Sequence, residues 1–364
     1  MPKVSVITPV YKTEAFLDKS LPSLTAQTLT DIELLWIDNG ASDECRRLMD
    51  KYATDKVKII RLPENIGYMG AINAGLNAAT GEYIGFCDSD DWVDPDWFEN
   101  LYKTAEAENA DMVLSPYIVE ESKKRRIVSL SSDMPPKNAA DLFENQKQGC
   151  IWNGLYRRAM IEKHGIRLPD GVKSIFRDNL FFVQAALYAG KSALQPKAGY
   201  HYVLHNSSTT KGIDRSVQKN AVMETLTELN DIVPADLMQK NEKGLASFLA
   251  RSLGISVLDK KEAASLAIFE TLPSLKQIYT EIKSYKSDSG CFRFPVSGNT
   301  PRFVFWGLRF HSNTERIQNE SRYFGGRSGD SSGRRNGRAS ETDGRHRRLP
   351  DFVGHYEKLF PLRV

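Results

Sequence analysis

Four aspartates crowd the end of one apolar segment. Asp88, Asp90, Asp91 and Asp94 lie within YIGFCDSDDWVDP, residues 83–95. Carboxylates this close repel one another unless a bound cation or a change in protonation relieves them. A hard divalent cation held by oxygen ligands would do so, and it would also stabilise negative charge on a substrate. The stretch therefore predicts that these carboxylates have a partner, and a bound cation or a change in protonation both remain open. The alternative is an Asp-rich turn that caps the following helix, which suits Asp94 better than Asp88 or Asp90.

The segments that must position these carboxylates alternate in type over the first 120 residues. Strands are expected at residues 4–8, 32–38, 56–62, 83–88 and 111–118, and helices at residues 15–29, 43–53, 69–79 and 95–108. This alternation predicts an α/β protein with a mainly parallel sheet and right-handed crossovers. Ligands bind at the carboxyl ends of such strands. The polar residues at 8–11, 38–43 and 88–91 are therefore expected to meet in one crevice.

Length and composition exclude several classes of protein. A chain of 364 residues exceeds what one compact domain usually needs, so a catalytic-sized domain with an appendage is expected. The net charge of +3 is too small to indicate nucleic acid as a main partner. The N-terminus does not resemble a signal peptide, and no long apolar run occurs, which predicts a cytoplasmic protein. The four cysteines lack a CxxC pair, which argues against a disulfide framework or a zinc site.

Several motifs in one order carry a family resemblance. The chain contains VSVITPVYKTEAFLDKSLPSLTAQTLTDIELLWIDNGASD, then NIGYMGAINAGLNAATGEYIGFCDSDDWVDP, then FRDNLFF, within residues 3–210. In sequence and order they resemble the motifs of the family 2 glycosyltransferases, an inverting family that binds nucleotide sugars. The resemblance implies the GT-A nucleotide-diphospho-sugar transferase fold, with a Rossmann-like sheet and a C-terminal helical region.

The implied organisation has three parts. Residues 1–212 would form the GT-A catalytic domain, with a nucleotide half at about 1–120 and an acceptor half at about 121–212. Leucines at helical spacing predict a helical region over residues 213–285. Residues 286–364 are rich in Arg, Gly and Ser and predict a poorly structured tail. An interaction tail and the product of an altered reading frame both remain open for it.

On the nucleotide side, the resemblance implies five positions. Pro9, Tyr11 and Glu14 would line the loop after the first strand, with Tyr11 against the base. Asp38 would accept a hydrogen bond from an N–H group of the base, since a carboxylate is a strong acceptor. Gly67 would let the backbone at a helix start approach the diphosphate.

One position on this side departs from the family pattern. The usual run Asp-Asp-Gly-Ser-x-Asp reads Asp-Asn-Gly-Ala-Ser-Asp at residues 38–43. Asn39 removes a charge and leaves base selectivity open. For Ser42 and Asp43, capping of the following helix is an equal alternative.

On the metal side, Asp88-Ser89-Asp90 matches the family DxD motif. The resemblance implies Mn²⁺ or Mg²⁺ on Asp90, with Asp88 directed to the metal or the ribose and Asp91 supporting them. We predict His201 as a third ligand. His205 is the alternative, and a structural role remains open for both.

On the acceptor side, Asp178 is the predicted catalytic base, which would take the proton of the acceptor hydroxyl. The family usually has a Glu-Asp pair here, whereas this chain has Arg177-Asp178. A convergent Arg177 would lower the pKa of Asp178 and weaken the base. A helix cap is the alternative for Asp178. Trp152 is predicted to stack on an acceptor sugar, or else to belong to the core.

Taken with the resemblance to the family 2 glycosyltransferases, these observations predict a metal-dependent inverting glycosyltransferase. It would move a sugar from a nucleotide sugar, a UDP-sugar by preference, to a hydroxyl of a glycan or lipid-linked acceptor in cell-surface polysaccharide synthesis. A lipid-linked acceptor would bring the helical region into peripheral contact with the inner membrane face. A dinucleotide-dependent oxidoreductase is disfavoured because the first turn lacks GxGxxG. The alternative is a non-catalytic nucleotide- or carbohydrate-binding protein that retains the fold, which Asn39, Arg177 and the tail suggest.

Overall fold

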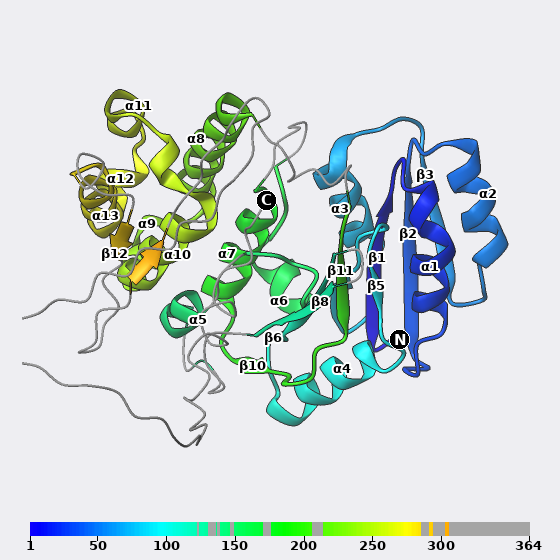
Figure 1. Cartoon of the computed structure of the whole chain (residues 1–364). Helices are drawn as coiled ribbons and strands as arrows, with labels where there is room; N and C mark the ends of the chain where they lie inside the picture. The colour runs from blue at the N-terminus through cyan, green and yellow to red at the C-terminus, as the bar shows by residue number, and fades with distance from the viewer. Residues whose placement is uncertain are drawn as a thin grey trace, which may run out of the picture.

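The structure is a computed structural model of the chain. It describes residues 1–121, 124–129, 136, 139–145, 149–169, 176–205, 214–284, 291–293 and 303–305. Figure 1 shows a sheet with its covering helices, which holds the N-terminus, and a group of helices formed by residues 214–284 on the other side of the molecule.

The larger sheet is mainly parallel. It contains β1 (Val4–Val10), β2 (Ile32–Asn39), β3 (Val57–Leu62), β4 (Tyr83–Phe86), β6 (Met112–Leu114), β9 (Gly154–Arg157) and β10 (Ser192–Leu194). Their order across the sheet is β10-β6-β9-β4-β1-β2-β3. Strand β9 pairs antiparallel with β4 and β6, and the other neighbours pair in parallel. The ends of β4, β1 and β2 therefore lie next to one another, as the sequence predicts.

Helices cover both faces of this sheet. They are α1 (Glu14–Thr25), α2 (Asp43–Tyr52), α3 (Gly67–Ala78) and α4 (Trp97–Glu108). Figure 1 shows α1 and α2 on one side of β1, β2 and β3, and α3 on the other. Right-handed crossovers require this, because the chain steps outward from β1 to β3 and then returns to β4. Helix α3 packs closely on β1: a Cβ added to Gly75 would lie 2.4 Å from Ile7 Cγ2.

A second, smaller sheet lies beside the carboxylates. It contains β5 (Trp92–Val93), β7 (Tyr117–Glu121), β8 (Lys124–Val128) and β11 (Tyr200–Leu204), in the order β5-β11-β7-β8. The single strand expected at residues 111–118 divides at Ser115 and Pro116, so that β6 and β7 belong to different sheets. Pro116 has no N–H for a ladder, and Ser115 N–H donates instead to Asn153 O at 3.0 Å.

The rest of the described chain is mainly helical. Its helices are α5 (Ala139–Asn145), α6 (Arg158–Lys163), α7 (Asp178–Tyr188), α8 (Arg215–Ile232), α9 (Ala235–Lys240), α10 (Glu242–Leu253), the 3-10 turn η1 (Ile255–Val257), α11 (Lys260–Ala264), α12 (Ile268–Thr271) and α13 (Pro273–Ser284). Aromatic rings join α5, α7 and α10: the centroids of Phe143 and Phe182 lie 5.4 and 5.2 Å from that of Phe248. The α/β fold with a mainly parallel sheet and C-terminal helices is thus confirmed.

Little of the predicted tail lies within the described residues. There, β12 (Cys291–Arg293) pairs antiparallel with β13 (Phe303–Phe305). The predicted domain boundaries near residue 212 fall outside the described residues and stay predictions. Among the helices described, none has both the length and the apolar character needed to cross a membrane.

Candidate active site

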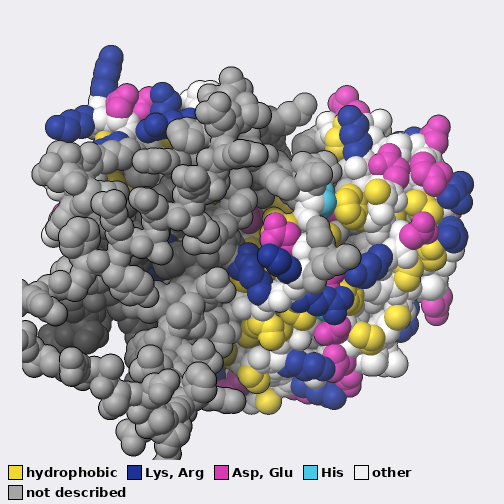
Figure 2. Space-filling view, in the orientation of Figure 1, with side chains coloured by type: hydrophobic (Ala, Val, Ile, Leu, Met, Phe, Trp, Pro, Cys, Tyr) yellow, Lys and Arg dark blue, Asp and Glu magenta, His cyan; other side chains and the backbone are white. Residues whose placement is uncertain are grey.

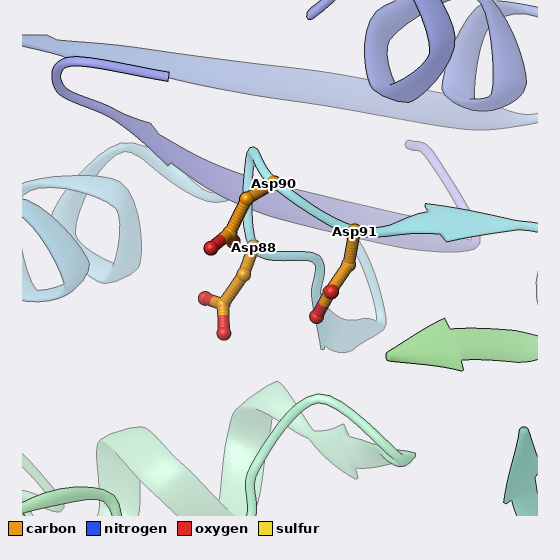
Figure 3. A group of neighbouring side chains, drawn as sticks. All are labelled: Asp88, Asp90 and Asp91. Carbon is orange, nitrogen blue, oxygen red and sulfur yellow. The ribbon is translucent and has the colours of Figure 1, made fainter. Parts of the chain in front are cut away.

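Three carboxylates converge in the turn after β4. Oxygen atoms of Asp88, Asp90 and Asp91 all lie within 4.8 Å of one another. Figure 3 shows the three side chains pointing to the same side of this turn. Oxygen atoms grouped this closely suit a hard divalent cation such as Mg²⁺ or Mn²⁺. Asp94, predicted as a capping residue, is not part of this group.

The local electrostatics show what a cation would relieve. Burial and the neighbouring charge of Asp90 raise the pKa of Asp88 to about 7. Tyr68 Oη donates a hydrogen bond to Asp88 Oδ1 at 2.9 Å, which opposes this rise. A carboxylate with such a pKa is only partly ionised near neutral pH, and a bound cation would favour its charged form.

Asp91 is held by the protein more firmly than its two neighbours. Its Oδ1 accepts a hydrogen bond from the Val203 N–H at 2.7 Å, and its Oδ2 accepts one from Tyr200 Oη at 2.7 Å. The same Tyr200 hydroxyl accepts from the Asp88 N–H at 3.1 Å. Asp91 therefore fixes the turn against β11, and the supporting role at the metal stays a prediction.

The two candidate histidines have different partners. His201 Nδ1 lies 3.0 Å from Glu120 Oε1, and His201 Nε2 lies 3.1 Å from Asp94 Oδ1. Its ring also stacks on Trp92, with centroids 3.4 Å apart. Both nitrogens of His201 thus contact carboxylates outside the group of Asp88, Asp90 and Asp91, and the structure does not place it as a ligand.

His205 lies at the carboxylates instead. Its Nε2 is 2.9 Å from Asp90 Oδ2, and its ring packs against Phe16 at a centroid distance of 4.3 Å. The histidine that the structure brings to the DxD motif is therefore the alternative, His205.

Side-chain hydrogen bonds join the three strand ends. Thr13 Oγ1 and Ser89 Oγ, the latter in the middle of the DxD motif, lie 2.9 Å apart. The Ser42 hydroxyl donates to Glu14 Oε1, and this hydrogen bond helps to hold the pKa of Glu14 below its usual range. Glu14 thus joins the β1–α1 loop to the start of α2, where Ser42 also accepts from the Cys45 N–H as a helix cap. Contact of Glu14 with a nucleotide stays a prediction.

Two further loop residues differ in exposure. Pro9 is buried within β1, where it lies opposite Ile37 of β2. Tyr11 has 37% of its surface exposed at the end of the strand. Of these two side chains, only that of Tyr11 presents an open surface to a base.

Asp38 is fully buried, with an exposed fraction of 0%. Its Oδ1 accepts from the Ala41 N–H at 2.8 Å, and its Oδ2 accepts from Arg46 Nε at 2.8 Å and from Arg61 at 3.3 Å. Burial raises the pKa of Asp38, but these hydrogen bonds outweigh it and hold the pKa below its usual range. Asp38 therefore holds the turn after β2. Its contact with a base stays a prediction, and in this geometry that contact would require the turn to open.

The hydrogen bonds of Asn39 show what this residue does in place of the aspartate that is usual in the family motif. Its Nδ2 donates to Gly67 O at 3.0 Å and to Asn65 Oδ1 at 3.3 Å, and its Oδ1 accepts from the Ile66 N–H at 2.9 Å. An amide can both donate and accept, whereas an aspartate could only accept. Asn39 thus ties β2 to the start of α3.

Gly67 lies at the first residue of α3 with a φ of +84°. An added Cβ would meet nothing within 4 Å, so the backbone here borders open space. This left-handed conformation favours glycine, and the helix start agrees with an approach by an anionic group.

Asp178 is the first residue of α7. Burial raises its pKa to about 6, and its Oδ1 accepts from the Asn179 N–H at 3.0 Å. Its charge contributes to the raised pKa of Asp88 and also acts on Tyr68, which places its carboxylate near theirs. A carboxylate with a pKa near neutrality is suited to general base catalysis.

Arg177 does not converge on Asp178. Its side chain is 2% exposed and makes ion pairs with Glu224, at 3.1 Å, and with Glu228, both on α8. Arg177 is not among the groups that shift the pKa of Asp178, so the predicted weakening of the catalytic base does not occur.

Trp152 lies in an aromatic stack with an exposed fraction of 7%. Its ring stacks on Tyr200 and Tyr202, with centroids 4.3 and 5.5 Å away, and meets the edge of Tyr117 at 4.7 Å. These neighbours cover its faces, so the core alternative describes its position. A role in acceptor binding is not supported by this packing.

The residues that sequence reasoning missed are mainly tyrosines. Tyr68 and Tyr200 donate hydrogen bonds to Asp88 and Asp91, respectively. Tyr68 directly follows the glycine predicted at the helix start, which was a usable signal. Tyr200 is separated from the DxD motif by more than a hundred residues and gave none.

The second sheet presents a basic edge beside the site. Lys124 and Arg125 of β8 are exposed, and Figure 2 shows lysine and arginine side chains gathered in the middle of the view, where Figure 1 labels β8. Arg125 and Lys19 share one carboxylate, that of Glu120, at 2.9 and 3.4 Å. Two cations against one anion leave positive charge at this edge, which would attract anionic substrates.

Comparisons with known proteins agree with this geometry. The family described as "Glycosyl transferase family 2" matches residues 5–165. The chain is 30% identical over 281 residues to the "Putative glycosyltransferase EpsH" of Bacillus subtilis, covering 74% of this chain and 81% of that protein. It is 26% identical over 245 residues to the "Poly(ribitol-phosphate) beta-N-acetylglucosaminyltransferase TarP" of Staphylococcus aureus, covering 65% and 72% of the two chains.

A solved structure shares the fold. The crystal structure of S. aureus TarS 1-349 in complex with UDP-GlcNAc matches with a TM-score of 0.60 and 19% identity, covering 84% of this chain and 100% of that one. This likeness concerns the fold, whereas the family match and the relative EpsH show that the chain belongs to glycosyl transferase family 2 and is an enzyme of glycosyl transfer.

Proposed function

We propose that the enzyme transfers a sugar from a UDP-sugar to a hydroxyl of a glycan or lipid-linked acceptor, with a divalent cation and with inversion at the anomeric carbon. One observation carries this proposal: the carboxylate group of Asp88, Asp90 and Asp91 lies near a separate, half-buried carboxylate, Asp178, at the start of α7. The group of three carboxylates suits a diphosphate leaving group. Asp178 suits removal of the proton from an acceptor hydroxyl.

The residues present fit a divalent cation. Asp88 and Asp90 would hold it, because the charge of Asp90 already raises the pKa of Asp88 and a cation would remove that repulsion. His205, beside Asp90, is placed to add a nitrogen ligand or to orient that carboxylate. When bound, Mg²⁺ or Mn²⁺ would offset the negative charge that develops on the departing diphosphate.

The base acts from α7. Asp178 would accept the proton of the acceptor hydroxyl as its oxygen attacks the anomeric carbon, opposite the departing UDP. A single in-line displacement inverts that carbon and needs no covalent enzyme intermediate. The raised pKa of Asp178 supports this role, because a base is most effective when its pKa lies near the working pH.

The nucleotide would lie across the ends of β1 and β2. Tyr11 offers an exposed ring for the base, and the open backbone at Gly67 borders the space for the diphosphate. The choice of UDP draws on the TarS structure, whose title names UDP-GlcNAc, and on the name of TarP, which specifies N-acetylglucosaminyl transfer.

The acceptor class draws on the relatives. One is a "Succinoglycan biosynthesis protein ExoO" of Rhizobium meliloti, and the name of another, TarP, specifies poly(ribitol-phosphate), so both names concern polymers. We therefore propose a role in cell-surface polysaccharide synthesis. The basic edge at Lys124 and Arg125 would favour an acceptor that carries phosphate, including a lipid diphosphate at the inner membrane face.

The test is donor turnover. Release of UDP from UDP-GlcNAc, UDP-galactose and UDP-glucose is measured with and without a synthetic lipid-diphosphate monosaccharide, in Mn²⁺ and then in EDTA. We expect one donor to be turned over, faster with the acceptor, and the activity to be lost in EDTA. Equal rates in Mn²⁺ and EDTA would contradict metal dependence. GDP release from GDP-mannose is measured in parallel, and turnover of GDP-mannose alone would contradict the choice of a uridine nucleotide.

A further inference from the structure

Arg177 is a buried charge next to the candidate base. It immediately precedes α7, and its side chain is 2% exposed although the guanidinium group is always charged. A charge removed from water is tolerated only when it is well paired, because its lost hydration must be replaced. Its partners therefore indicate what this residue does.

Both partners lie on one helix of the C-terminal region. Arg177 Nη2 is 3.1 Å from Glu224 Oε2, and Arg177 Nη1 pairs with Glu228. The two glutamates are four residues apart on α8, so they lie on the same face one turn apart. Glu228 has only 23% of its side chain exposed, so this pair is shielded from solvent.

We propose that Arg177 is a positioning residue that ties the first turn of α7, and with it the Asp178 carboxylate, to helix α8. This inference rests on the proposed role of Asp178 as the base. The two glutamates hold the guanidinium on the side of α8 and keep it from pairing with Asp178. Helix α8 thereby becomes part of the machinery that places the base, although none of its residues need contact the substrates.

The backbone at this point supports the assignment. Phe176, directly before Arg177, has a φ of +71°, a left-handed conformation that bulky residues rarely adopt. Such a conformation persists only where the surroundings determine it. Asn179 Nδ2 donates to Phe176 O at 3.1 Å, and the Leu180 N–H donates to Arg177 O at 3.0 Å. These bonds fix the turn from within, and the ion pairs of Arg177 fix it from α8.

The nucleotide side is built from other elements. The carboxylates of Asp88 and Asp90 follow β4, and the hydrogen bonds that join the strand ends come from the β1 and β2 loops. Loss of the Arg177 ion pairs should therefore lower turnover while leaving the affinity for UDP and Mn²⁺ unchanged. If Arg177 contributed only to overall stability, its loss would not lower turnover without also weakening the binding of UDP and Mn²⁺.

The variants are chosen to separate these outcomes. Arg177→Met removes the cation, and Glu228→Gln removes one partner by a milder change. Arg177→Glu is compared with the pair Arg177→Glu/Glu228→Arg, which restores the ion pair with its charges exchanged. Lys219→Met is the matched control, because Lys219 also lies on α8 but pairs with Glu262 of α11, at 2.5 Å.

Each variant is measured in two ways: kcat for turnover of the best UDP-sugar, and the Kd for UDP with Mn²⁺ by calorimetry. We expect kcat to fall on the order of 100-fold in Arg177→Met, as for a misplaced catalytic group, with the Kd for UDP changed less than about twofold. The exchanged pair should recover about tenfold in kcat over Arg177→Glu. Lys219→Met should keep kcat within about twofold of the wild type.

Several results would overturn the proposal. Unchanged kcat in a folded Arg177→Met or Glu228→Gln would do so, as would a parallel loss of kcat and UDP affinity in these variants and in Lys219→Met. If Arg177→Met does not fold, Glu228→Gln and the exchanged pair decide the question. A wild-type protein that neither binds UDP nor turns over a UDP-sugar contradicts the proposed function itself and removes the basis of this inference. That result is seen before any variant is compared.

Discussion

Replacing Asp178 by asparagine should remove activity and at the same time stabilise the protein at neutral pH. Burial raises the pKa of this carboxyl from 3.8 to about 6. A difference of about 2 units corresponds to about 3 kcal/mol at most, and partial hydration of the half-buried group reduces this to about 1–3 kcal/mol. Asparagine keeps the shape and still accepts from the Asn179 N–H, but it carries no charge to desolvate.

The sign of the effect depends on pH. The folded state binds the proton of Asp178 more tightly than the unfolded state, so between about pH 4 and 6 the contribution of Asp178 to stability falls as the pH rises. Above about pH 6 the whole cost of the buried charge is present. Asp178→Asn should therefore exceed the wild type in the free energy of unfolding by about 1–3 kcal/mol at pH 8, and by much less at pH 4.5.

Urea unfolding at both pH values measures this difference, and UDP release measures turnover. The control is Asp236→Asn on α9, whose side chain is 77% exposed, so its charge is already hydrated. Loss of a general base should lower kcat about 10²–10⁴-fold. Equal stability differences at pH 8 and 4.5, or a kcat within about tenfold of the wild type, would refute the assignment of Asp178 as a buried catalytic base.

Three further predictions concern the site and the packing of α3 on β1. Because the pKa of Asp88 is about 7, the Kd for Mn²⁺ measured by calorimetry should rise about tenfold between pH 8 and pH 6. Tyr68→Phe removes a hydrogen bond that favours the charged form of Asp88, so it should move this rise in Kd to higher pH. A Kd that does not change with pH would contradict both predictions. Asn39→Asp, which restores the usual family residue, should lower the free energy of unfolding by about 1–3 kcal/mol at pH 8, because two donated hydrogen bonds at the loop before α3 are lost, and an unchanged urea midpoint would count against this. Gly75→Ala should cost about 1–3 kcal/mol in the same assay, because the added Cβ would overlap Ile7, and a neutral effect would show that α3 can move away from β1.

The site could be predicted from sequence where local rules set the geometry. Parallel strands with right-handed crossovers place the ends of β4, β1 and β2 side by side, so the meeting of the DxD motif with the two loops followed from strand order. Helix starts were predicted within a few residues, because capping and apolar spacing are local. The division at Pro116 was missed although proline gave a usable signal.

Other features depended on partners far along the chain. His201 lies in β11, whereas His205 follows the last residue of that strand, so no local pattern chooses between them. Only their contacts distinguish the two histidines: His201 lies against Glu120 and Asp94, whereas His205 lies against Asp90. The direction of Arg177 likewise depends on α8, a helix whose position no local pattern reveals.

The central claim is that the enzyme has a metal-dependent nucleotide site and a separate catalytic base, Asp178. Its most direct test is calorimetric titration of UDP into the protein with Mn²⁺ and again with EDTA. It is made on the wild type, Asp90→Asn, Asp178→Asn and the control Asp236→Asn. We predict that UDP binds the wild type and the control only with Mn²⁺, that Asp90→Asn loses this binding, and that Asp178→Asn retains it while losing turnover. Binding of UDP that is unaffected by EDTA and by Asp90→Asn would contradict the account.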